Sequence, residues 1–409
     1  MRFIYNILIS IIGFFLHFVA LFQPKIRLFI KGRQQTFKTL NEKLDAKKPT
    51  IWMHAASLGE YEQGLPLLEK LKKDHPQYQF LLTFFSPSGF EVKKDKTPAD
   101  VVVYLPLDTK SNADRFLQIV NPRLVIFIKY EIWPNYLHEL NRLKTPTLLV
   151  SAIFSKKQFF FKPFGGFMRK SLKSFLHFFV QDENSKVLLK TIGFENCSVS
   201  GDTRFDRVSQ ILKSDSTLDF METFKSNQRC FVAGSTWPED EAILMDYINT
   251  TNEKVVIAPH NIKEKHIEKM IAATTKTVVK YSDIKKHDLK EISVLLIDTI
   301  GLLTKIYGYA DIAYVGGGFA TGLHNTLEPA VFGIPVIIGP NYEGFKEAED
   351  LVAQKGIFSV SDKNSFNTTV EKLWNDNDHY KKTGNINHSY VQKQQGATKE
   401  ITTFINSLL

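Results

Sequence analysis

The chain has 409 residues, 43% of them hydrophobic and 23% charged, a composition that excludes a largely disordered protein. This length is sufficient for two domains with full hydrophobic cores. The net charge of +9 fits an anionic substrate or membrane surface, and because no arginine-rich or aromatic-basic motif is present we expect no nucleic-acid partner. Cys197 and Cys230 lack metal-ligand spacing and form no disulfide framework, which fits a reducing compartment.

The N-terminal segment carries no charged side chain from Phe3 to Pro24, a length that can cross a bilayer as a helix. A basic stretch follows from Lys25 to Lys48, whereas only Arg2 precedes the apolar segment. The positive-inside rule therefore places the body of the protein in the cytoplasm, and we expect residues 1–24 to be a membrane anchor. A spanning helix, a helix lying flat on the membrane and a helix buried against the first domain remain open.

After this segment, short apolar runs alternate with helical patterns, which is typical of a parallel sheet covered by helices. The first series has expected strands at residues 50–54, 80–84, 101–105, 124–128, 147–150 and 178–181, with helices at 61–73, 113–119 and 133–143. The second series has expected strands at 230–233, 254–258, 294–297, 312–315 and 335–338, with helices at 239–250 and 300–309.

Two consecutive α/β series of similar length predict two Rossmann-like domains. We expect an N-terminal domain over residues 25–200, a C-terminal domain over 201–385 and a C-terminal helix over 386–409. Ligands bind at the carboxyl ends of the strands in such sheets, so we expect a central cleft between two facing domains. Residues that directly follow strands are therefore the candidates for chemistry.

Glu60 follows the first expected strand and opens the first helix. Ser57 and Glu60 form the capping-box pattern, which is by itself a sufficient reason for an acid at this position. The position also suits a general base that activates a sugar hydroxyl at the mouth of the cleft. The pattern alone supports the two roles equally.

Glu131 follows the apolar strand at residues 124–128 and precedes Trp133 and Pro134. An acid at the end of a buried strand is well placed to contact an acceptor or to orient another group. The alternative is a helix N-terminal acid ahead of the proline. We favour the functional role.

Ser86 and Ser88 flank a proline directly after the strand at residues 80–84. A Ser-Pro-Ser helix start can bind an anionic group through its hydroxyl and N–H groups. A plain N-cap with proline at N1 would have the same pattern. The pattern alone favours the plain N-cap, and the two serines are kept as candidate acceptor-binding residues.

Loops after the strands of the second series are polar or rich in glycine. Ser235 and Thr236 follow the strand at residues 230–233, and His260 follows the next strand. Three such loops, the third being the glycine turn described below, predict a nucleotide-sugar pocket. Arg204, near the domain junction, suits a phosphate or carboxylate contact or a surface salt bridge.

The segment at residues 314–340 has the pattern of a strand, a Gly-Gly-Gly turn, a helix and a second strand. The glycines, Gly317 among them, allow positive φ and the close approach of a ligand. We expect a helix over residues 325–332 whose N-terminus, at Asn325, offers free N–H groups and a positive dipole end to a phosphate. Glu328, in its first turn, suits a ribose contact or a favourable N-terminal charge.

Six motifs, in order, resemble the 3-deoxy-D-manno-octulosonic acid (Kdo) transferases of lipopolysaccharide assembly. They lie at residues 52–60, 104–108, 131–135, 201–206, 233–236 and 316–340. The resemblance covers nearly the whole chain, including the N-terminal anchor. Two positions depart from the family pattern: this chain has His260 in Pro-His-Asn where the family usually has Pro-Arg-His, and Arg204 where it often has lysine.

The resemblance implies a GT-B fold, and transfer of Kdo from CMP-Kdo to a lipid A precursor (lipid IVA) with inversion and without a metal or cofactor. It implies a place at the cytoplasmic face of the inner membrane. Glu60 matches the general base of the family, and Glu131 matches a second acid near the acceptor. The matching donor-binding residues are Ser235, Thr236, Gly317, Asn325 and Glu328, to which the local pattern adds His260 and Arg204.

Two other functions fit parts of the pattern. A nucleotide-sugar epimerase can share the two-domain architecture, but it has no need of the apolar N-terminal segment. A non-catalytic, membrane-associated nucleotide-binding protein would not be expected to keep acids such as Glu60 and Glu131.

Overall fold

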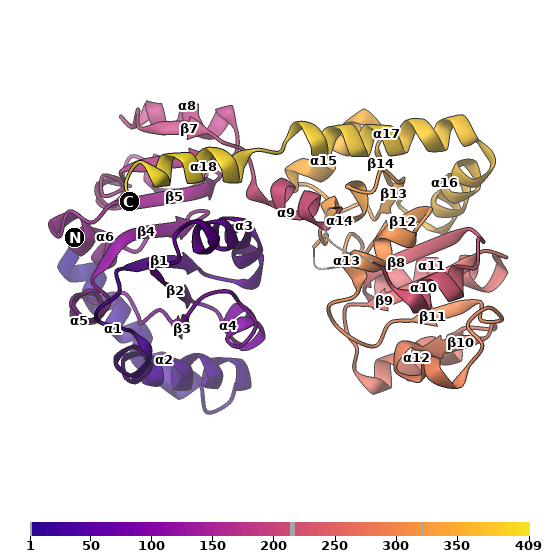
Figure 1. Ribbon diagram of the computed structural model, residues 1–409, viewed down its shortest axis with the longest axis horizontal. Coiled ribbons are helices and arrows are strands. Elements are labelled where there is room, and N and C mark those ends of the chain that lie inside the picture. Colours follow the sequence, from indigo (N-terminus) through magenta and orange to yellow (C-terminus); the bar gives the residue numbers. More distant parts are fainter. Residues whose placement is uncertain (1, 213–216, 321) are drawn as a thin grey trace. The chain divides into compact units, whose positions relative to one another are not determined.

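The computed structural model describes residues 2–212, 217–320 and 322–409, so Thr321 of the glycine-rich segment lies outside the described residues. The chain divides into two compact units (Figure 1). Unit 1 comprises Met1–Arg207 and Gln395–Leu409, and unit 2 comprises Val208–Gln394. Each unit contains one parallel sheet, as the alternating pattern of strands and helices predicts.

The sheet of unit 1 has the strand order β3-β2-β1-β4-β5-β6-β7. Its strands are β1 (Thr50–Ala55), β2 (Gln79–Phe84), β3 (Val101–Tyr104), β4 (Pro122–Ile128), β5 (Thr147–Ala152), β6 (His177–Val180) and β7 (Cys197–Val199). The helices between them are α3 (Leu58–Asp74), α4 (Pro87–Lys93), α5 (Lys110–Val120), α6 (Pro134–Arg142), α7 (Gly166–Leu172) and α8 (Glu183–Thr191). After β3 the chain returns to the other side of β1, so β1 and β4 form the topological switch point.

The sheet of unit 2 has the strand order β10-β11-β9-β8-β12-β13-β14. Its strands are β8 (Cys230–Thr236), β9 (Lys254–Pro259), β10 (Val278–Lys280), β11 (Val294–Leu296), β12 (Ile312–Val315), β13 (Val336–Ile338) and β14 (Ile357–Ser359). The helices are α10 (Asp219–Lys225), α11 (Pro238–Thr250), α12 (Glu264–Ala273), α13 (Leu303–Ile306), α14 (Leu327–Ala330), α15 (Lys346–Gln354), α16 (Lys363–Asn375) and α17 (Asn377–Lys393). Here the switch point lies between β8 and β12.

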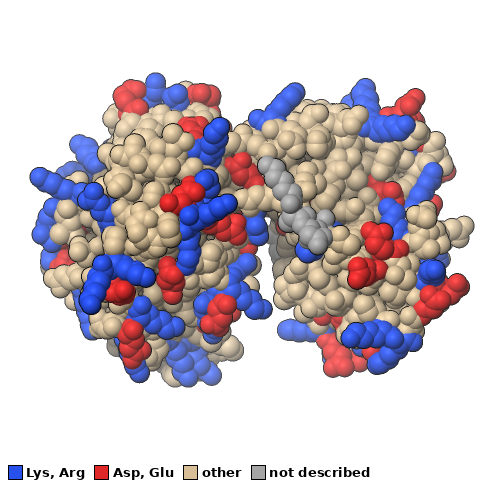
Figure 2. Space-filling view, in the orientation of Figure 1, with Lys and Arg blue, Asp and Glu red and all other residues tan. Residues whose placement is uncertain are grey.

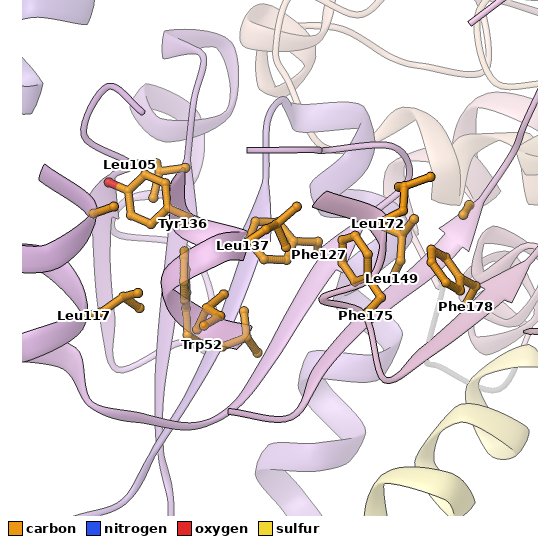
Figure 3. Close-up of a cluster of buried hydrophobic side chains, with 14 of the residues drawn as sticks. Trp52, Leu105, Leu117, Phe127, Tyr136, Leu137, Leu149, Leu172, Phe175 and Phe178 are labelled. Atoms are coloured by element: carbon orange, nitrogen blue, oxygen red, sulfur yellow. The ribbon is translucent and has the colours of Figure 1, made fainter. Parts of the chain in front are cut away.

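The strands are apolar because helices cover both faces of each sheet. All six residues of β1 are buried, and successive side chains enter opposite cores. Trp52 packs in one core, with its ring centroid 5.4 Å from that of Phe127 and 5.8 Å from that of Tyr136 (Figure 3). Ile51 and Met53 pack in the core on the other face. This double burial makes the sheet a rigid base for the loops at its carboxyl edge.

The expected domain boundaries at residues 200/201 and 385/386 differ from those of the structure. The segment after residue 200 stays with unit 1 because Gln63 Nε2 donates to both carboxylate oxygens of Asp202, at 3.3 and 3.2 Å. α9 (Thr203–Ile211) then crosses the boundary at Arg207. The carboxylate of Asp206 accepts from the backbone N–H groups of Gly396 and Thr398 at 2.8 and 2.7 Å, which fixes the returning chain on unit 1.

The C-terminal segment expected to be helical, residues 386–409, contains the end of one helix and the whole of a second. α17 belongs to unit 2, and α18 (Ala397–Asn406) belongs to unit 1, where Figure 1 shows it beside α3. The break lies at Gly396, whose φ of 120° is not helical. α18 packs on unit 1 through Ala397, Ile401 and Ile405, which share one face at a spacing of four residues.

The N-terminal segment forms α1 (Arg2–Val19), followed by α2 (Pro24–Lys43). α1 is the one helix among the described residues that is long and apolar enough to cross a bilayer. The first turns of α1 contact the rest of unit 1 through polar side chains. Arg2 Nε donates to Asn135 Oδ1 at 2.9 Å, and Tyr5 OH donates to Asp108 Oδ2 at 2.8 Å.

Most of the apolar side chains of α1 remain exposed. Phe3, Phe14 and Phe18 are 76%, 74% and 62% exposed. Of the three arrangements left open by the sequence, a helix buried against the first domain is therefore wrong. Figure 2 shows basic and acidic side chains interspersed over the visible face of each unit.

Candidate active site

Glu60 and Glu131 both lie at the switch point of the unit 1 sheet. β1 and β4 are paired neighbours, with His54 opposite Phe127. Glu60 is the third residue of α3, which follows β1, and Glu131 lies in the loop after β4. Ligands bind at this place in doubly wound sheets because the connecting loops diverge there. The fold thus brings together the two acids that the sequence analysis identified.

The carboxylate of Glu60 is buried and hydrogen-bonded to the backbone. The residue is 7% exposed, and its Oε2 accepts from the N–H of Ala56. Ser57 is the N-cap of α3 and accepts from the N–H of Glu60 at 3.5 Å. The Ser57 cap expected from the sequence is therefore present, and Glu60 additionally directs a carboxylate oxygen back to the strand end.

The pKa of Glu60 is raised to about 7 from its usual 4.5, chiefly because burial disfavours the charged carboxylate. The negative charge of Glu131 raises this pKa further. The Ala56 N–H group and the charge of Lys129 act in the opposite direction. A carboxylate with a pKa near the working pH is both available and basic enough to accept a proton, as general base catalysis requires.

Glu131 lies beside a buried histidine that the sequence analysis did not single out. Its Oε2 is 3.5 Å from Nε2 of His54, a fully buried residue of β1. Trp133 Nε1 donates to His54 Nε2 at 3.2 Å, so the His54 proton lies on Nδ1, which contacts Thr83 Oγ1 at 2.8 Å. This network orients the loop that carries Glu131. The feature of the sequence that could have identified His54 is a histidine within an otherwise apolar strand.

Ser86 and Ser88 begin α4, as expected from the sequence. Ser86 is its N-cap and accepts from the N–H of Ser88 at 3.3 Å, and the two hydroxyl oxygens are 3.0 Å apart. Arg33 of α2 supports this turn, because its Nη2 donates to the carbonyl of Phe85 at 2.7 Å. The structure therefore establishes the capping role, and acceptor binding by these serines stays a prediction.

Arg204 forms the salt bridge that was one of its two expected roles. Its Nε donates to Asp202 Oδ2 at 2.7 Å, and its backbone N–H donates to Asp202 Oδ1 at 2.9 Å. Asp202 is almost fully buried, whereas the Arg204 side chain is 26% exposed. The pairing fixes the guanidinium in one orientation, and its contact with a phosphate stays a prediction.

In unit 2 the glycine turn follows β12, at the switch point with β8. Of the three glycines only Gly317 has positive φ, 95°. A Cβ on Gly316 would lie 2.3 Å from the carbonyl oxygen of Ser235, and a Cβ on Gly318 would lie 2.7 Å from the backbone N of Gly339. Glycine is thus required at these two positions because other segments of the protein backbone approach closely. The expectation from the sequence was the close approach of a ligand.

Asp240 holds the glycine turn in place. This fully buried side chain accepts from the N–H groups of Gly317 and Trp237 at 2.8 and 2.9 Å and from Tyr314 OH at 2.7 Å. The N–H group of Gly317 is therefore already paired, and the expected role of Gly317 in donor binding stays a prediction. The sequence signal that was missed is an acid at the N3 position of α11, whose carboxylate accepts from the N–H of the N-cap residue Trp237.

The expected helix at residues 325–332 is much shorter. α14 covers only Leu327–Ala330, since Pro329 has no N–H group and Gly333, at φ 70°, ends the turn. A single turn offers a far weaker dipole than the predicted helix. Asn325 and Glu328 nevertheless lie together, because Asn325 Nδ2 donates to Glu328 Oε1 at 3.2 Å. Thr304 donates to the other oxygen of Glu328 at 2.8 Å.

The ends of β8 and β9 bring further predicted residues to the same edge of the sheet. Ser235 has a positive φ of 55°, whereas Thr236 is buried and donates to Glu241 Oε1 at 3.0 Å. His260 is exposed and stacks on Trp237, with ring centroids 4.5 Å apart. Its ring also lies 4.8 Å from that of His324. His260 therefore presents an exposed ring at this edge and the Thr236 hydroxyl is already paired, and ligand contact by Ser235, Thr236 and His260 stays a prediction.

His324 belongs to the same cluster of rings. Trp237 Nε1 donates to His324 Nε2 at 3.1 Å, and burial together with the nearby His260 lowers the pKa of His324. Among the described residues, no group of three His, Cys, Asp or Glu side chains has the arrangement of a metal site.

Residues 31–207 match the family model of the 3-deoxy-D-manno-octulosonic-acid transferases (Kdo transferases). The chain is 28% identical over 375 residues to the 3-deoxy-D-manno-octulosonic acid transferase of Haemophilus influenzae, covering 88% of this chain and 87% of that protein. It is 29% identical to a bifunctional glycosyltransferase/methyltransferase of Fusobacterium nucleatum, over 86% of this chain and 57% of that protein. The chain thus spans little more than half the length of the bifunctional relative.

Solved structures support the fold. A UDP-GlcNAc 2-epimerase from Neisseria meningitidis superimposes with a TM-score of 0.63, over 88% of this chain and 100% of the other, at 15% sequence identity. At this identity the similarity concerns the fold alone, and it confirms the prediction of two Rossmann-like domains of the GT-B type. The family model matches residues 31–207 of unit 1, and Kdo transferase relatives match most of the chain, so this chain is similar to the Kdo transferases.

Proposed function

We propose that the protein transfers Kdo from CMP-Kdo to a hydroxyl of a lipid A precursor, with inversion at the anomeric carbon and with Glu60 as general base. One observation carries this proposal: Glu60 lies at the switch point of the unit 1 sheet with its pKa raised to about 7. A carboxyl whose pKa lies near neutrality suits a general base, because it is largely ionised at the working pH and still basic enough to accept a proton.

In the proposed reaction, Glu60 accepts the proton of the acceptor hydroxyl while the hydroxyl oxygen bonds to the anomeric carbon of Kdo. The bond from that carbon to the phosphate oxygen of CMP breaks, and CMP leaves with the electron pair. A single displacement of this kind inverts the configuration. The charge of Glu131 raises the pKa of Glu60. Glu131 also joins the neighbouring network, with its Oε2 3.5 Å from His54 Nε2.

Unit 2 is the proposed donor-binding unit. Ser235 and His260 supply a hydroxyl and an exposed imidazole at the carboxyl ends of β8 and β9. Asn325 and Glu328 form the pair that we assign to the ribose of CMP, since a carboxylate oxygen can accept from ribose hydroxyls. Arg204 and Thr236 remain predicted donor residues. The N–H group of Gly317 is paired with Asp240, so Gly317 is proposed to contribute to donor binding only through the shape of the glycine turn.

The acceptor is proposed to reach unit 1 from the membrane. α1 contacts unit 1 at its start, where Arg2 Nη2 donates to Glu139 Oε1 at 3.2 Å. α2, which follows directly, also packs on unit 1, with Thr36 Oγ1 donating to the carbonyl of Tyr104 at 2.9 Å. Because both ends of α1 are tied to one unit, we propose that α1 lies in the interface of the cytoplasmic face of the inner membrane and does not span the bilayer. Ser86 and Ser88 are the proposed acceptor contacts.

Mass spectrometry of the product tests the proposed function. Full-length protein in detergent is incubated with CMP-Kdo and lipid IVA, and the lipid is expected to gain the mass of at least one Kdo unit. Conversion of a nucleotide sugar without any acceptor would favour an epimerase of similar fold. Binding of CMP without any transfer would favour a non-catalytic nucleotide-binding protein. Either of these results would overturn the proposal.

A further inference from the structure

A basic groove lies in unit 2, away from the residues assigned to the donor. Its main cavity, of about 610 Å³, is enclosed by the end of α15, strand β14 and helices α16 and α17. The residues that matter for its chemistry are Lys355, Phe358, Lys372, His379, Lys382 and Ile386. No Asp or Glu is among the described residues that line it. We call this cavity and its extension along α17 the α17 groove.

Three lysines of the α17 groove converge on one histidine. Burial is the largest cause of the lowered pKa of His379, and the charges of Lys372, Lys382 and Lys355 lower it further. Asp376 alone opposes them, and its carboxylate also accepts from the backbone N–H of His379 at 2.9 Å, as the N-cap of α17. The four basic side chains therefore share one small region of positive potential.

These lysines are available to a ligand. All three lie on the exposed surface, and in the described part of the chain none forms an ion pair with a carboxylate. By contrast, Lys346 on the nearby α15 pairs with Asp350. Like charges held together repel one another, and Asp376 offsets only part of this repulsion, so binding of an anion relieves an existing cost as well as forming new contacts.

The groove also has an apolar side and room for more than a small ion. Phe358 of β14 packs against His379, with ring centroids 5.4 Å apart, and Ile386 of α17 lines the same cavity. A second cavity of about 840 Å³ shares Gln354, Lys382 and Ile386 with the first and continues along α17. Its lining includes Asp350, which is paired with Lys346. Figure 1 places α17 at the outer edge of unit 2, where Figure 2 shows several basic side chains.

We propose that the α17 groove binds a phosphate group attached to an apolar body. Lysine ammonium groups suit a phosphate as point charges with several donors each, and a singly charged carboxylate would neutralise less of the cluster. The apolar portion would lie against Phe358 and Ile386. This site is distinct from the proposed donor site, because Ser235, His260 and Glu328 do not line it. It therefore does not depend on the proposed transfer reaction.

The test follows the imidazole signals of the full-length protein by NMR, with His379 assigned from its loss in His379→Gln. The probes are inorganic phosphate, a short-chain alkyl phosphate below its micelle concentration, and vesicles of phosphatidylglycerol or of phosphatidylcholine. Phosphate and alkyl phosphate are expected to shift the His379 signal and to raise its pKa, with the alkyl phosphate binding at least about tenfold more tightly. Lys372→Gln and Lys382→Gln are each expected to weaken binding by about tenfold.

Lys269→Gln is the matched control, because Lys269 is an exposed lysine of α12 outside the groove. It is expected to bind every probe as the unchanged protein does. A response to free alkyl phosphate identifies a soluble organophosphate as the ligand, and a response to phosphatidylglycerol vesicles alone identifies a lipid phosphate. No change at His379 with any probe, or an equal loss of affinity in Lys269→Gln, would overturn the proposal.

Discussion

The charge of Glu131 acts on Glu60, and it raises the pKa of that buried carboxyl beyond the increase due to burial. The two acids come from loops after neighbouring strands, β1 and β4. Their coupling makes a prediction about the pH dependence of the reaction. If Glu60 is the base, the rate rises with pH as Glu60 loses its proton, with a midpoint near pH 7 in the free enzyme.

Glu131→Gln is expected to move this ascending limb to lower pH, since it removes the negative charge that helps to raise the pKa of Glu60. The measurement is kcat/KM for Kdo transfer between about pH 5 and 9. Glu91→Gln is the control, because Glu91 is an acid of the same unit that does not influence the pKa of Glu60. An unchanged limb in Glu131→Gln would show that Glu60 does not set the pH dependence.

The raised pKa of Glu60 also predicts a pH-dependent stability. Between about pH 4.5, the pKa of the unfolded carboxyl, and pH 7, the folded protein binds a proton that the unfolded chain has lost. The wild-type free energy of unfolding should therefore fall across this window relative to that of Glu60→Gln. The difference should level off above pH 7 at roughly 3 kcal/mol at most. Urea unfolding of both proteins at several pH values measures it, and a constant difference would contradict the assigned pKa.

Asp240 is expected to be essential for the glycine turn. Asp240→Asn weakens two N–H bonds and the bond from Tyr314 OH, so we expect a loss of roughly 2–4 kcal/mol in the free energy of unfolding. Tyr314→Phe removes only one of these bonds and should cost about 1–2 kcal/mol. Urea unfolding measures both, and CMP binding should weaken more in Asp240→Asn than in Tyr314→Phe. Equal stabilities of Asp240→Asn and the unchanged protein would rule out this role.

The exposed face of α1 is expected to hold the protein on membranes. Phe14→Glu and Phe18→Glu each remove an exposed phenyl ring from the membrane-facing side, at a cost of about 1.5–3 kcal/mol of binding. Co-sedimentation with anionic vesicles measures the loss. Ile300→Glu is the matched control, because Ile300 is 83% exposed but lies in unit 2. If all three variants remained bound to the same extent, α1 would not be the anchor.

Hydrophobic periodicity predicted most of the fold. All the expected strands are present, because strands buried on both faces are apolar throughout. The strands that were missed, β7, β10 and β14, have three residues each and lie at sheet edges. Such short runs carry little pattern. The place of α18 on unit 1 was missed for a different reason, because it depends on contacts with α3, which is distant in the sequence. The central cleft stays a prediction.

The site was predicted less completely than the fold. Glu60 and Glu131 could be found because each follows a recognisable strand. His54, Trp133 and Asp240 were missed because their importance depends on contacts between distant segments. The expected helix at residues 325–332 was too long because Pro329 and the glycines limit it to one turn. Sequence patterns thus located the loops, and only the three-dimensional contacts showed which backbone groups are already paired.

The most direct test of the central claim compares initial rates of Kdo transfer from CMP-Kdo to lipid IVA for wild-type protein and Glu60→Gln. Glutamine keeps the size of the side chain and an oxygen that can accept from the Ala56 N–H group, but it cannot take up a proton at neutral pH. We predict that kcat falls by at least about 100-fold while CMP-Kdo still binds with nearly wild-type affinity. A Glu60→Gln protein that transfers Kdo at the wild-type rate would contradict the assignment of Glu60 as the base.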